Sequence, residues 1–340
     1  MRKILIVLLL LGIIFSSVTI EASGVFIDAG SAVLIEKNSK RILYQKDCHE
    51  QFLTASIVKI MTAIIVIENS DVYEYVEVTK EATLQIGSSI YLESGDKLKV
   101  IDLLYGMLLR SGNDAAFLLS QAVTLSPVEF SNLMNDKAKE LKMTSSVFTN
   151  PTGLDDETQN YSTAYDMALL MAYCLDNEIF REIIGTKSYS TTSYNGKKYT
   201  FFNKHKLVNS VDYVTGGKTG YTTKAKRTLV TSAKKNGMEL IAVTFKCSDD
   251  WNSHIKLFDF GFSNYSLKTV LDEGIIVVDD DLYNITPYNP FKISYPLKDD
   301  EYIYVIVYLL KNPKKERIIG EAKLYLDGQI VISTLIYRYY

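Results

Sequence analysis

Histidine, cysteine and tryptophan are scarce in this 340-residue chain, which has three histidines, three cysteines and one tryptophan. The cysteines are odd in number and far apart, so they predict neither a disulfide framework nor a zinc site. The histidines fit no metal-ligand spacing and no nucleophile–histidine motif. These absences disfavour metal chemistry and a histidine base; the residues concerned are Cys48, Cys174, Cys247, His49, His205 and His254. Cys174 lies in an apolar helical stretch, where we expect a buried thiol.

An excess of positive charge is also missing. The formal net charge is −3 at pH 7, so the long-range attraction to phosphate that nucleic-acid-binding proteins use is absent. Only six prolines occur and 47% of the residues are hydrophobic, which favours a folded chain over a disordered one. The length predicts one large domain followed by a small one.

Residues 1–22 have the character of a secretory signal. Arg2 and Lys3 precede an apolar run at 4–15, and a more polar stretch leads to small residues near Ala22. The run is shorter than the roughly 20 apolar residues that span a bilayer. We therefore expect a secreted, extracytoplasmic protein. If the signal stays uncleaved, it would keep the protein peripherally associated with the outer face of the membrane.

Residues 23–264 predict an α+β domain in which strands from both ends of the segment flank a helical centre. The expected helices place apolar residues at helical spacing, and two expected hairpins turn at Asn-Gly pairs. Helices are predicted at 54–68, 100–109, 114–123, 129–141, 163–175 and 255–260, and strands at 25–35, 41–45, 189–192, 198–202, 229–234 and 239–245.

Residues 265–340 predict a small, all-β domain. Short β-branched and aromatic segments at 275–278, 302–309, 321–326 and 329–336 alternate with turns. No amphipathic helix follows them, so we expect no second membrane anchor of that kind. A spacer and a partner-binding module would have the same sequence character, and both interpretations stay open.

The first candidate for chemistry is Ser56, which is followed three residues later by Lys59 in a predicted helix. This spacing places the hydroxyl and the ammonium on one helix face. A serine needs an adjacent base to act as a nucleophile, and a lysine can be that base when burial or a neighbouring cation lowers its pKa. The same spacing occurs elsewhere in the chain, so an ordinary serine near a helix start is the alternative.

Two further motifs join it. Ser111-Gly112-Asn113 interrupts two apolar helices, where a turn can direct both polar side chains into a cleft or can simply cap a helix. Lys218-Thr219-Gly220 occurs once and is followed by Tyr221. A glycine there lets another backbone approach closely, although a surface hairpin loop is the alternative interpretation.

Taken in this order, the three motifs resemble the signature of penicillin-binding proteins and serine β-lactamases. Within that superfamily the chain is similar to the D-alanyl-D-alanine carboxypeptidases, serine peptidase family S11, from about residue 25 to 264. The resemblance also covers the blocks 55–62, 102–116, 150–155, 161–168 and 217–222. It implies a β-lactamase/transpeptidase-like domain, an antiparallel sheet with helices, and the β tail resembles the small domain that often follows.

The resemblance implies that Ser56 attacks the bond between two D-alanines of a peptidoglycan stem peptide. Lys59 would then be the base, Ser111 the proton relay, Asn113 the holder of the substrate amide, and Lys218 a source of positive charge. It also implies that Thr219 binds the terminal carboxylate and that Gly220 lets the peptide lie along the strand. The backbone N–H groups of Ser56 and Tyr221 would bind the oxyanion. No metal or organic cofactor is implied, and β-lactams would be covalent inhibitors.

Some positions depart from the family pattern. Asn160 stands where a histidine is usual, Lys226 and Arg227 follow Ala225 where a glycine is usual, and Cys247–Trp251 replaces a segment that often holds an arginine. A non-catalytic, wall-binding scaffold with a decayed site is therefore one alternative, and a D,D-endopeptidase is another. A β-lactamase is disfavoured, because no glutamate-containing loop of the class A type is evident.

Overall fold

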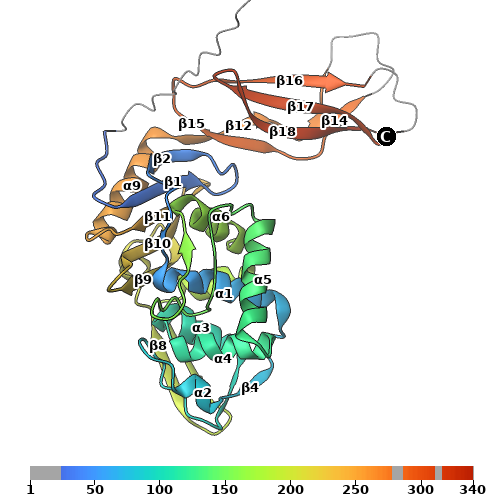
Figure 1. Cartoon of the computed structure of the whole chain (residues 1–340). Coiled ribbons are helices and arrows are strands. Elements are labelled where there is room, and N and C mark those ends of the chain that lie inside the picture. Colours follow the sequence, from blue (N-terminus) through green and yellow to red (C-terminus); the bar gives the residue numbers. More distant parts are fainter. Residues whose placement is uncertain (1–23, 278–285, 311–315, 340) are drawn as a thin grey trace, which may run out of the picture.

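The structure, a computed structural model, describes residues 24–277, 286–310 and 316–339. Its centre is a five-stranded antiparallel sheet with the order β2-β1-β11-β10-β9. The strand β1 comes from the start of the described chain and pairs with β11, about 200 residues later (Figure 1). The strands are β1 (Ser31–Glu36), β2 (Ile42–Lys46), β9 (Val214–Thr222), β10 (Lys226–Lys235) and β11 (Met238–Phe245).

Helices cover both faces of this sheet. On one face α6 packs on β1 and β11 and α1 lies beneath it, whereas α9 covers the other face. The helices are α1 (Lys59–Asn69), α2 (Lys80–Thr83), α3 (Val100–Arg110), α4 (Asn113–Val123), α5 (Pro127–Glu140), α6 (Ala164–Cys174), α7 (Glu178–Gly185), α8 (Lys206–Ser210) and α9 (Asp250–Asn264). The fold is thus three layers, helix–sheet–helix, with a helical lobe below (Figure 1).

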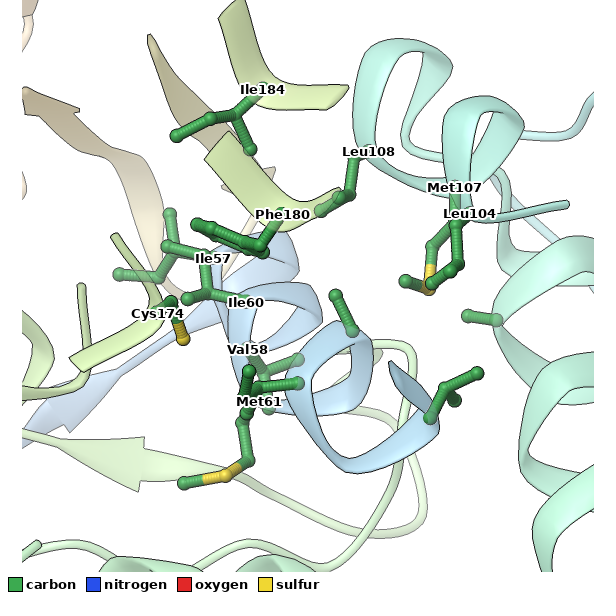
Figure 2. Packing of buried hydrophobic residues seen from close by; sticks show 14 of the residues in the cluster. Ile57, Val58, Ile60, Met61, Leu104, Met107, Leu108, Cys174, Phe180 and Ile184 are labelled. Carbon is green, nitrogen blue, oxygen red and sulfur yellow. The ribbon is translucent and has the colours of Figure 1, made fainter. Parts of the chain in front are cut away.

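The largest core surrounds α1 and the short 3₁₀ turn η1 (Ala55–Val58) that precedes it. Ile57, Ile60 and Met61 are fully buried among side chains from α3, α6 and α7 (Figure 2). Each buried aliphatic side chain contributes roughly 1.5–3 kcal/mol. This packing fixes the position of η1, and with it the position of Ser56.

Short two-stranded sheets complete this part of the chain. They pair β3 with β6, β4 with β5, and β7 with β8. Their bounds are Phe52–Leu53, Tyr161–Ser162, Tyr75–Glu77, Lys97–Lys99, Ser188–Thr192 and Lys198–Phe202, in that order of pairing.

The C-terminal β region (residues 266–277, 286–310 and 316–339) lies beside the edge of the central sheet formed by β1 and β2 (Figure 1). It has a five-stranded sheet, β13-β14-β18-β17-β16, and a pair, β12-β15. Arg41 joins it to the rest of the protein through a salt bridge to Glu301 and through the rings of Tyr265 and Tyr295. The strands are β12 (Ser266–Leu271), β13 (Gly274–Ile275), β14 (Pro287–Asn289), β15 (Ile293–Leu297), β16 (Ile303–Leu309), β17 (Ile318–Leu326) and β18 (Gln329–Arg338).

The predicted fold class is confirmed: an α+β region with an antiparallel sheet is followed by an all-β region. The predicted helices and hairpins occur with shifted ends, the largest shift being at the helix predicted at 255–260, which spans Asp250–Asn264. Of the strand predicted at 275–278, Ile275 ends β13 and Val278 lies outside the described residues. Cys174 is fully buried as expected. The predicted signal at 1–22 lies outside the described residues. In the described segments, we find no helix with the length and apolar character needed to cross a membrane.

Two local predictions were wrong. The strand expected at 25–35 begins only at Ser31, because the preceding residues form almost no ladder hydrogen bonds. The helix expected from Thr54 begins as the 3₁₀ turn η1, and the Thr54 side chain makes no cap hydrogen bond. Instead, the Thr54 carbonyl accepts a hydrogen bond from Thr228 Oγ1 at 3.0 Å, which ties the turn to β10.

Candidate active site

Ser56 and Lys59 lie at the junction of η1 and α1. The Nζ atom of Lys59 is 3.0 Å from Ser56 Oγ and 2.7 Å from Asn113 Oδ1, and it also donates to the carbonyl of Thr152. The Lys59 side chain is completely buried. The predicted pair of nucleophile and base is therefore within hydrogen-bonding distance, as general-base activation requires.

The loop of residues 150–153 packs against this junction. Gly153 has a φ of +85°, and a Cβ atom there would lie 2.0 Å from the Ala55 carbonyl oxygen. Only glycine fits both this backbone conformation and this approach. Asn150 Oδ1 accepts from the Gly153 and Thr152 amides, so the Thr152 carbonyl that receives Lys59 is fixed.

The Ser111-Gly112-Asn113 turn lies between α3 and α4. Ser111 ends α3 in the left-handed conformation with a φ of 64°. Asn113 is anchored twice, because its backbone N–H bonds to the Ser88 carbonyl at 2.7 Å and its side-chain amide bonds to the Ile86 carbonyl at 2.6 Å. The turn therefore directs both polar side chains toward the lysines and does not merely cap a helix.

The Lys218-Thr219-Gly220 motif lies on β9, an edge strand of the central sheet. Lys218 Nζ is 3.1 Å from Ser111 Oγ. A Cβ atom on Gly220 would lie 3.0 Å from the Ser56 backbone nitrogen and 2.3 Å from Thr228 Oγ1, so glycine lets β9 approach the nucleophile. Thr219 is half-buried and the Tyr221 side chain is exposed. The absence of a side chain at Gly220 thus lets strand β9 lie close to the Ser56 backbone amide.

The buried lysines have strongly perturbed titration. Burial lowers the pKa of Lys59 well below its ordinary value, and the charges of Lys218 and Lys204 lower it further. Burial and the charge of Lys204 also lower the pKa of Lys218 to about 7. A lysine that is neutral near pH 7 can accept a proton, which an ordinary surface lysine cannot do.

Lys204 was not among the site residues predicted from the sequence. Its backbone N–H bonds to the Leu109 carbonyl at 3.0 Å, and its Nζ is 3.3 Å from Ser88 Oγ. These contacts place a third cation beside the two motif lysines. No local pattern in the sequence marks it, because its neighbours α3 and the 84–91 loop are about 100 residues away.

Asn160 has a defined role in the local geometry. Its Oδ1 accepts from the Thr149 amide at 2.7 Å and from the Asn150 amide at 3.2 Å, and its Nδ2 donates to the Asn150 carbonyl at 3.1 Å. The residue therefore fixes the loop that carries Thr152 and Gly153. This departure from the family pattern leaves the site assembled.

Arg227 points away from the lysines, toward α9. It forms a two-pronged salt bridge with the buried Asp250, at 3.0 and 2.8 Å, and its guanidinium lies 5.6 Å from the centre of the Trp251 ring. This departure therefore joins β10 to α9. Lys226 precedes it with a φ of 60°, at the first residue of β10.

Two histidines are buried on the α9 side of the sheet, remote from the nucleophile. Thr231 Oγ1 is 2.9 Å from His205 Nε2 and 2.8 Å from His254 Nδ1, and Thr244 Oγ1 is 3.0 Å from His254 Nε2. Burial lowers the pKa of His205 to about 3 and that of His254 well below its ordinary value. Among the described residues, no cluster of three or more His, Cys, Asp or Glu side chains is arranged to hold a metal ion.

Comparison with known proteins gives a consistent picture. Residues 18–249 match the family model described as D-alanyl-D-alanine carboxypeptidase. The chain is 38% identical over 246 residues to the D-alanyl-D-alanine carboxypeptidase DacF of Bacillus subtilis, which covers 70% of this chain and 63% of that protein. It is 33% identical over 271 residues to DacC of Escherichia coli, covering 74% of this chain and 65% of that protein. The chain thus spans slightly less than two thirds of the length of these two relatives.

Solved structures extend the comparison. A D-alanyl-D-alanine carboxypeptidase from Mycobacterium tuberculosis superposes with a TM-score of 0.67 at 28% identity, covering 70% of this chain and 92% of that one. DacD from Francisella tularensis has the same fold over 93% of this chain and 94% of its own, with a TM-score of 0.73 at 22% identity. The family model and these relatives match the chain, and the structure contains the serine–lysine contact of the predicted site. The chain therefore belongs to the D-alanyl-D-alanine carboxypeptidases of peptidase family S11.

Proposed function

We propose that this protein is a serine-type carboxypeptidase that removes the terminal D-alanine from peptidoglycan stem peptides. The observation that carries the proposal is the contact of Ser56 Oγ with a fully buried lysine, at 3.0 Å. Burial and the charges of Lys218 and Lys204 lower the pKa of Lys59, which favours the neutral amine that a base requires. A positioned general base of this kind typically accelerates a reaction by about 10²–10⁴-fold.

In the acylation step, Lys59 takes the proton of Ser56, and Ser56 Oγ forms a bond to the carbonyl carbon between the two D-alanines. The carbon–nitrogen bond then breaks, and Ser111 relays a proton to the departing nitrogen. Ser111 lies 3.1 Å from Lys218 Nζ, which supports its place in the proton path. The products are free D-alanine and an acyl-Ser56 ester.

Substrate alignment depends on β9 and Asn113. The peptide would lie as an added strand along the outer edge of β9, which Gly220 lets lie close to the Ser56 amide. Thr219 and the charge of Lys218 would bind the terminal carboxylate, and Asn113 would hold the substrate amide. The N–H groups of Ser56 and Tyr221 would stabilise the oxyanion, and the loss of one such donor typically costs about 10²–10³-fold in rate.

Water then hydrolyses the acyl-Ser56 ester, and the carboxylic acid product leaves. Penicillin should acylate Ser56 in the same way, because opening of its β-lactam ring mimics cleavage of the D-alanyl bond. Every bond change in this cycle uses the chain, the substrate and water, so no metal or organic cofactor is invoked.

The substrate lies outside the cytoplasm, so we also propose that residues 1–22 direct export and that the protein acts on the wall side of the membrane. Residues 23–264 would form the catalytic domain and 265–340 a separate small domain. The break between α9, which ends at Asn264, and β12, which begins at Ser266, supports this division. An uncleaved signal would keep the enzyme at the outer membrane face.

The test is D-alanine release from a soluble diacyl-L-lysyl-D-alanyl-D-alanine peptide by the purified protein and by its Ser56→Ala variant. Release by the first and none by the second is the expected result. A folded protein that binds the peptide without shortening it would favour the scaffold alternative. Cleavage of purified cross-linked dimers alone, without release from the soluble peptide, would identify a D,D-endopeptidase.

A further inference from the structure

The C-terminal β region contains a hollow that the catalytic proposal does not use. It has a volume of about 880 Å³, within the range of sites that hold small molecules. Strands β14, β17 and β18 form it, together with the segments that flank them. The described side chains that line it are Tyr288, Pro290, Phe291, Glu316, Arg317, Ile318, Tyr337, Arg338 and Tyr339.

Among the described side chains that line this hollow, positive charges outnumber negative ones, although the chain as a whole is negative. Arg317 and Arg338 line it, against a single carboxylate from Glu316. Arg317 has no salt-bridge partner among the described residues, and its guanidinium lies 5.9 Å from the centre of the Tyr337 ring. An exposed guanidinium held over a ring is suited to pair with a carboxylate, which it can contact with two parallel hydrogen bonds.

Aromatic rings make up most of the remaining lining. The Tyr288 and Tyr339 rings lie 5.5 Å apart, and Phe291 and Tyr339 are 64% and 52% exposed. A ring face carries partial negative charge and attracts the weakly positive C–H bonds of a sugar ring. Tyrosine adds a hydroxyl for hydrogen bonds at the edge of the ring, and it loses little conformational entropy on binding.

The rings continue across the outer face of the sheet. Tyr337 lies on the side opposite the buried Ile336, because side chains alternate along a strand. On the same face Tyr304 stacks on Tyr325 at 5.0 Å, and the hydroxyls of Tyr308 and Tyr325 are 3.2 Å apart. Exposed tyrosines thus extend from the hollow to the edge strand β16, a path longer than a single sugar unit.

We propose that this tyrosine-lined hollow and the adjoining sheet face bind an acidic saccharide, a segment of wall glycan whose muramic acid sugars have lost their stem peptides and so carry free lactyl carboxylates. The choice of glycan rests on the proposed function, since the stem peptides are attached to such a polymer. Arg317 matches the carboxylate, the rings match the sugar faces, and the row of tyrosines matches a polymer. A concave site with polar groups fits a saccharide better than a flat bilayer.

The site lies at a distance from the catalytic serine. In Figure 1, β18 ends at the C label, at the end of the C-terminal β region that points away from the central sheet. A glycan strand bound there would leave the cleft between η1 and β9 open. The β region would then hold the enzyme on the wall while the catalytic site works on nearby stem peptides.

The probe is a peptide-free glycan, prepared with an amidase so that each muramic acid carries a free lactyl carboxylate. It has no D-alanine and cannot enter the reaction, so its binding is independent of the proposed activity. Binding to the full chain is measured by isothermal titration. Neutral chitin oligosaccharides test the need for the carboxylate, and phosphatidylglycerol vesicles test a lipid surface. D-alanine release from the soluble peptide is measured in parallel.

We expect the acidic glycan to bind and Arg317→Gln to weaken it about tenfold, the loss of one charge-assisted hydrogen bond. Tyr339→Ser should weaken it severalfold. Tyr194→Ser, which removes a 72% exposed tyrosine at the turn between β7 and β8, should leave binding unchanged. All three variants should release D-alanine at the wild-type rate. Equal binding by Arg317→Gln, equal affinity for chitin, binding only to vesicles, or concentration-dependent dimers with no glycan affinity would each overturn the proposal.

Discussion

The central sheet has buried bases on both faces, and the two faces use them differently. On the α1 side, Lys59 and Lys218 contact Ser56 and Ser111. On the α9 side, His205 and His254 share the Thr231 hydroxyl. Burial lowers the pKa of all four side chains. Burial and a perturbed pKa therefore do not identify a catalytic group by themselves.

What differs is the partner. Each lysine contacts a serine hydroxyl near the edge strand β9, and Ser56 is partly exposed. Each histidine contacts threonine hydroxyls that are completely buried between β10, β11 and α9. The lysines also lie near another cation, Lys204, whereas the histidines lie in a closed network of hydrogen bonds. We infer that the first pair serves chemistry and the second serves the fold.

The largest expected effect is on the lysine side. Lys59→Met should lower the rate of acylation by benzylpenicillin about a thousandfold, because Ser56 loses its base. The Asn113 amide oxygen and the Thr152 carbonyl lose a donor while a buried amine is removed, so the two contributions to stability offset in part and the variant should stay folded. Stopped-flow acylation and thermal unfolding measure the two effects. Lys206→Met, at an exposed position on α8, is the matched control. Acylation at the normal rate by Lys59→Met would show that the buried lysine is not the base.

The histidine side should give the reverse result. His254→Leu leaves the buried hydroxyls of Thr231 and Thr244 without one partner, so the free energy of unfolding should fall by about 1–3 kcal/mol. Acylation at 25 °C should stay within a few fold of wild type. Urea unfolding and penicillin labelling measure both quantities. A large loss of acylation in a fully folded variant would show that this face also takes part in the chemistry.

Acid should act through the histidines. Their pKa values are lowered on folding, to about 3 for His205, while an unfolded histidine titrates near pH 6.5. The unfolded state therefore binds protons first as the pH falls. Stability is lost below about pH 6.5 at up to roughly 1.4 kcal/mol per pH unit for each histidine, and for His205 this loss continues to about pH 3. In urea unfolding between pH 7 and 5, His254→Leu should show a shallower loss than wild type, and parallel curves would contradict the assignment.

The smallest effect concerns Lys204. Its charge lowers the pKa of Lys59 and of Lys218, so Lys204→Met should raise both. The acid limb of the acylation rate should move to higher pH by about half a unit to one unit, and the rate at pH 6 should fall severalfold. Lys206→Met again serves as the control. An unchanged profile would mean that Lys204 does not influence the lysine pair.

The sequence allowed the motif residues to be predicted because each motif is local and its chemistry is carried by residue type. Ser56 and Lys59 are three residues apart across the junction of η1 and α1, and Lys218-Thr219-Gly220 lies on one strand. Lys204 could not be predicted, since its contacts to Leu109 and Ser88 join segments about 100 residues apart. The role of Asn160 also required the folded loop, because its amide acts on backbone groups of Thr149 and Asn150.

For the fold as well, sequence patterns predicted local elements but not contacts between distant segments. Hairpins with Asn-Gly turns were predictable because both strands and the turn are adjacent in sequence, as at Asn236-Gly237. The pairing of β1 with β11 was not, since no local signal specifies a partner 200 residues away. The 3₁₀ turn η1 was expected as a helix, because apolar spacing alone does not report the contacts with β10 and Gly153 that reshape it.

The most direct test of the account is the site of penicillin attachment. The purified protein is incubated with benzylpenicillin, its intact mass is measured, and the modified peptide is mapped, beside Ser56→Ala and Lys59→Met. We predict one penicillin adduct per chain on Ser56, no adduct on Ser56→Ala, and very slow formation of the adduct on Lys59→Met. An adduct on another residue, or none on a folded wild-type protein, would contradict the assignment of Ser56 and Lys59 as nucleophile and base.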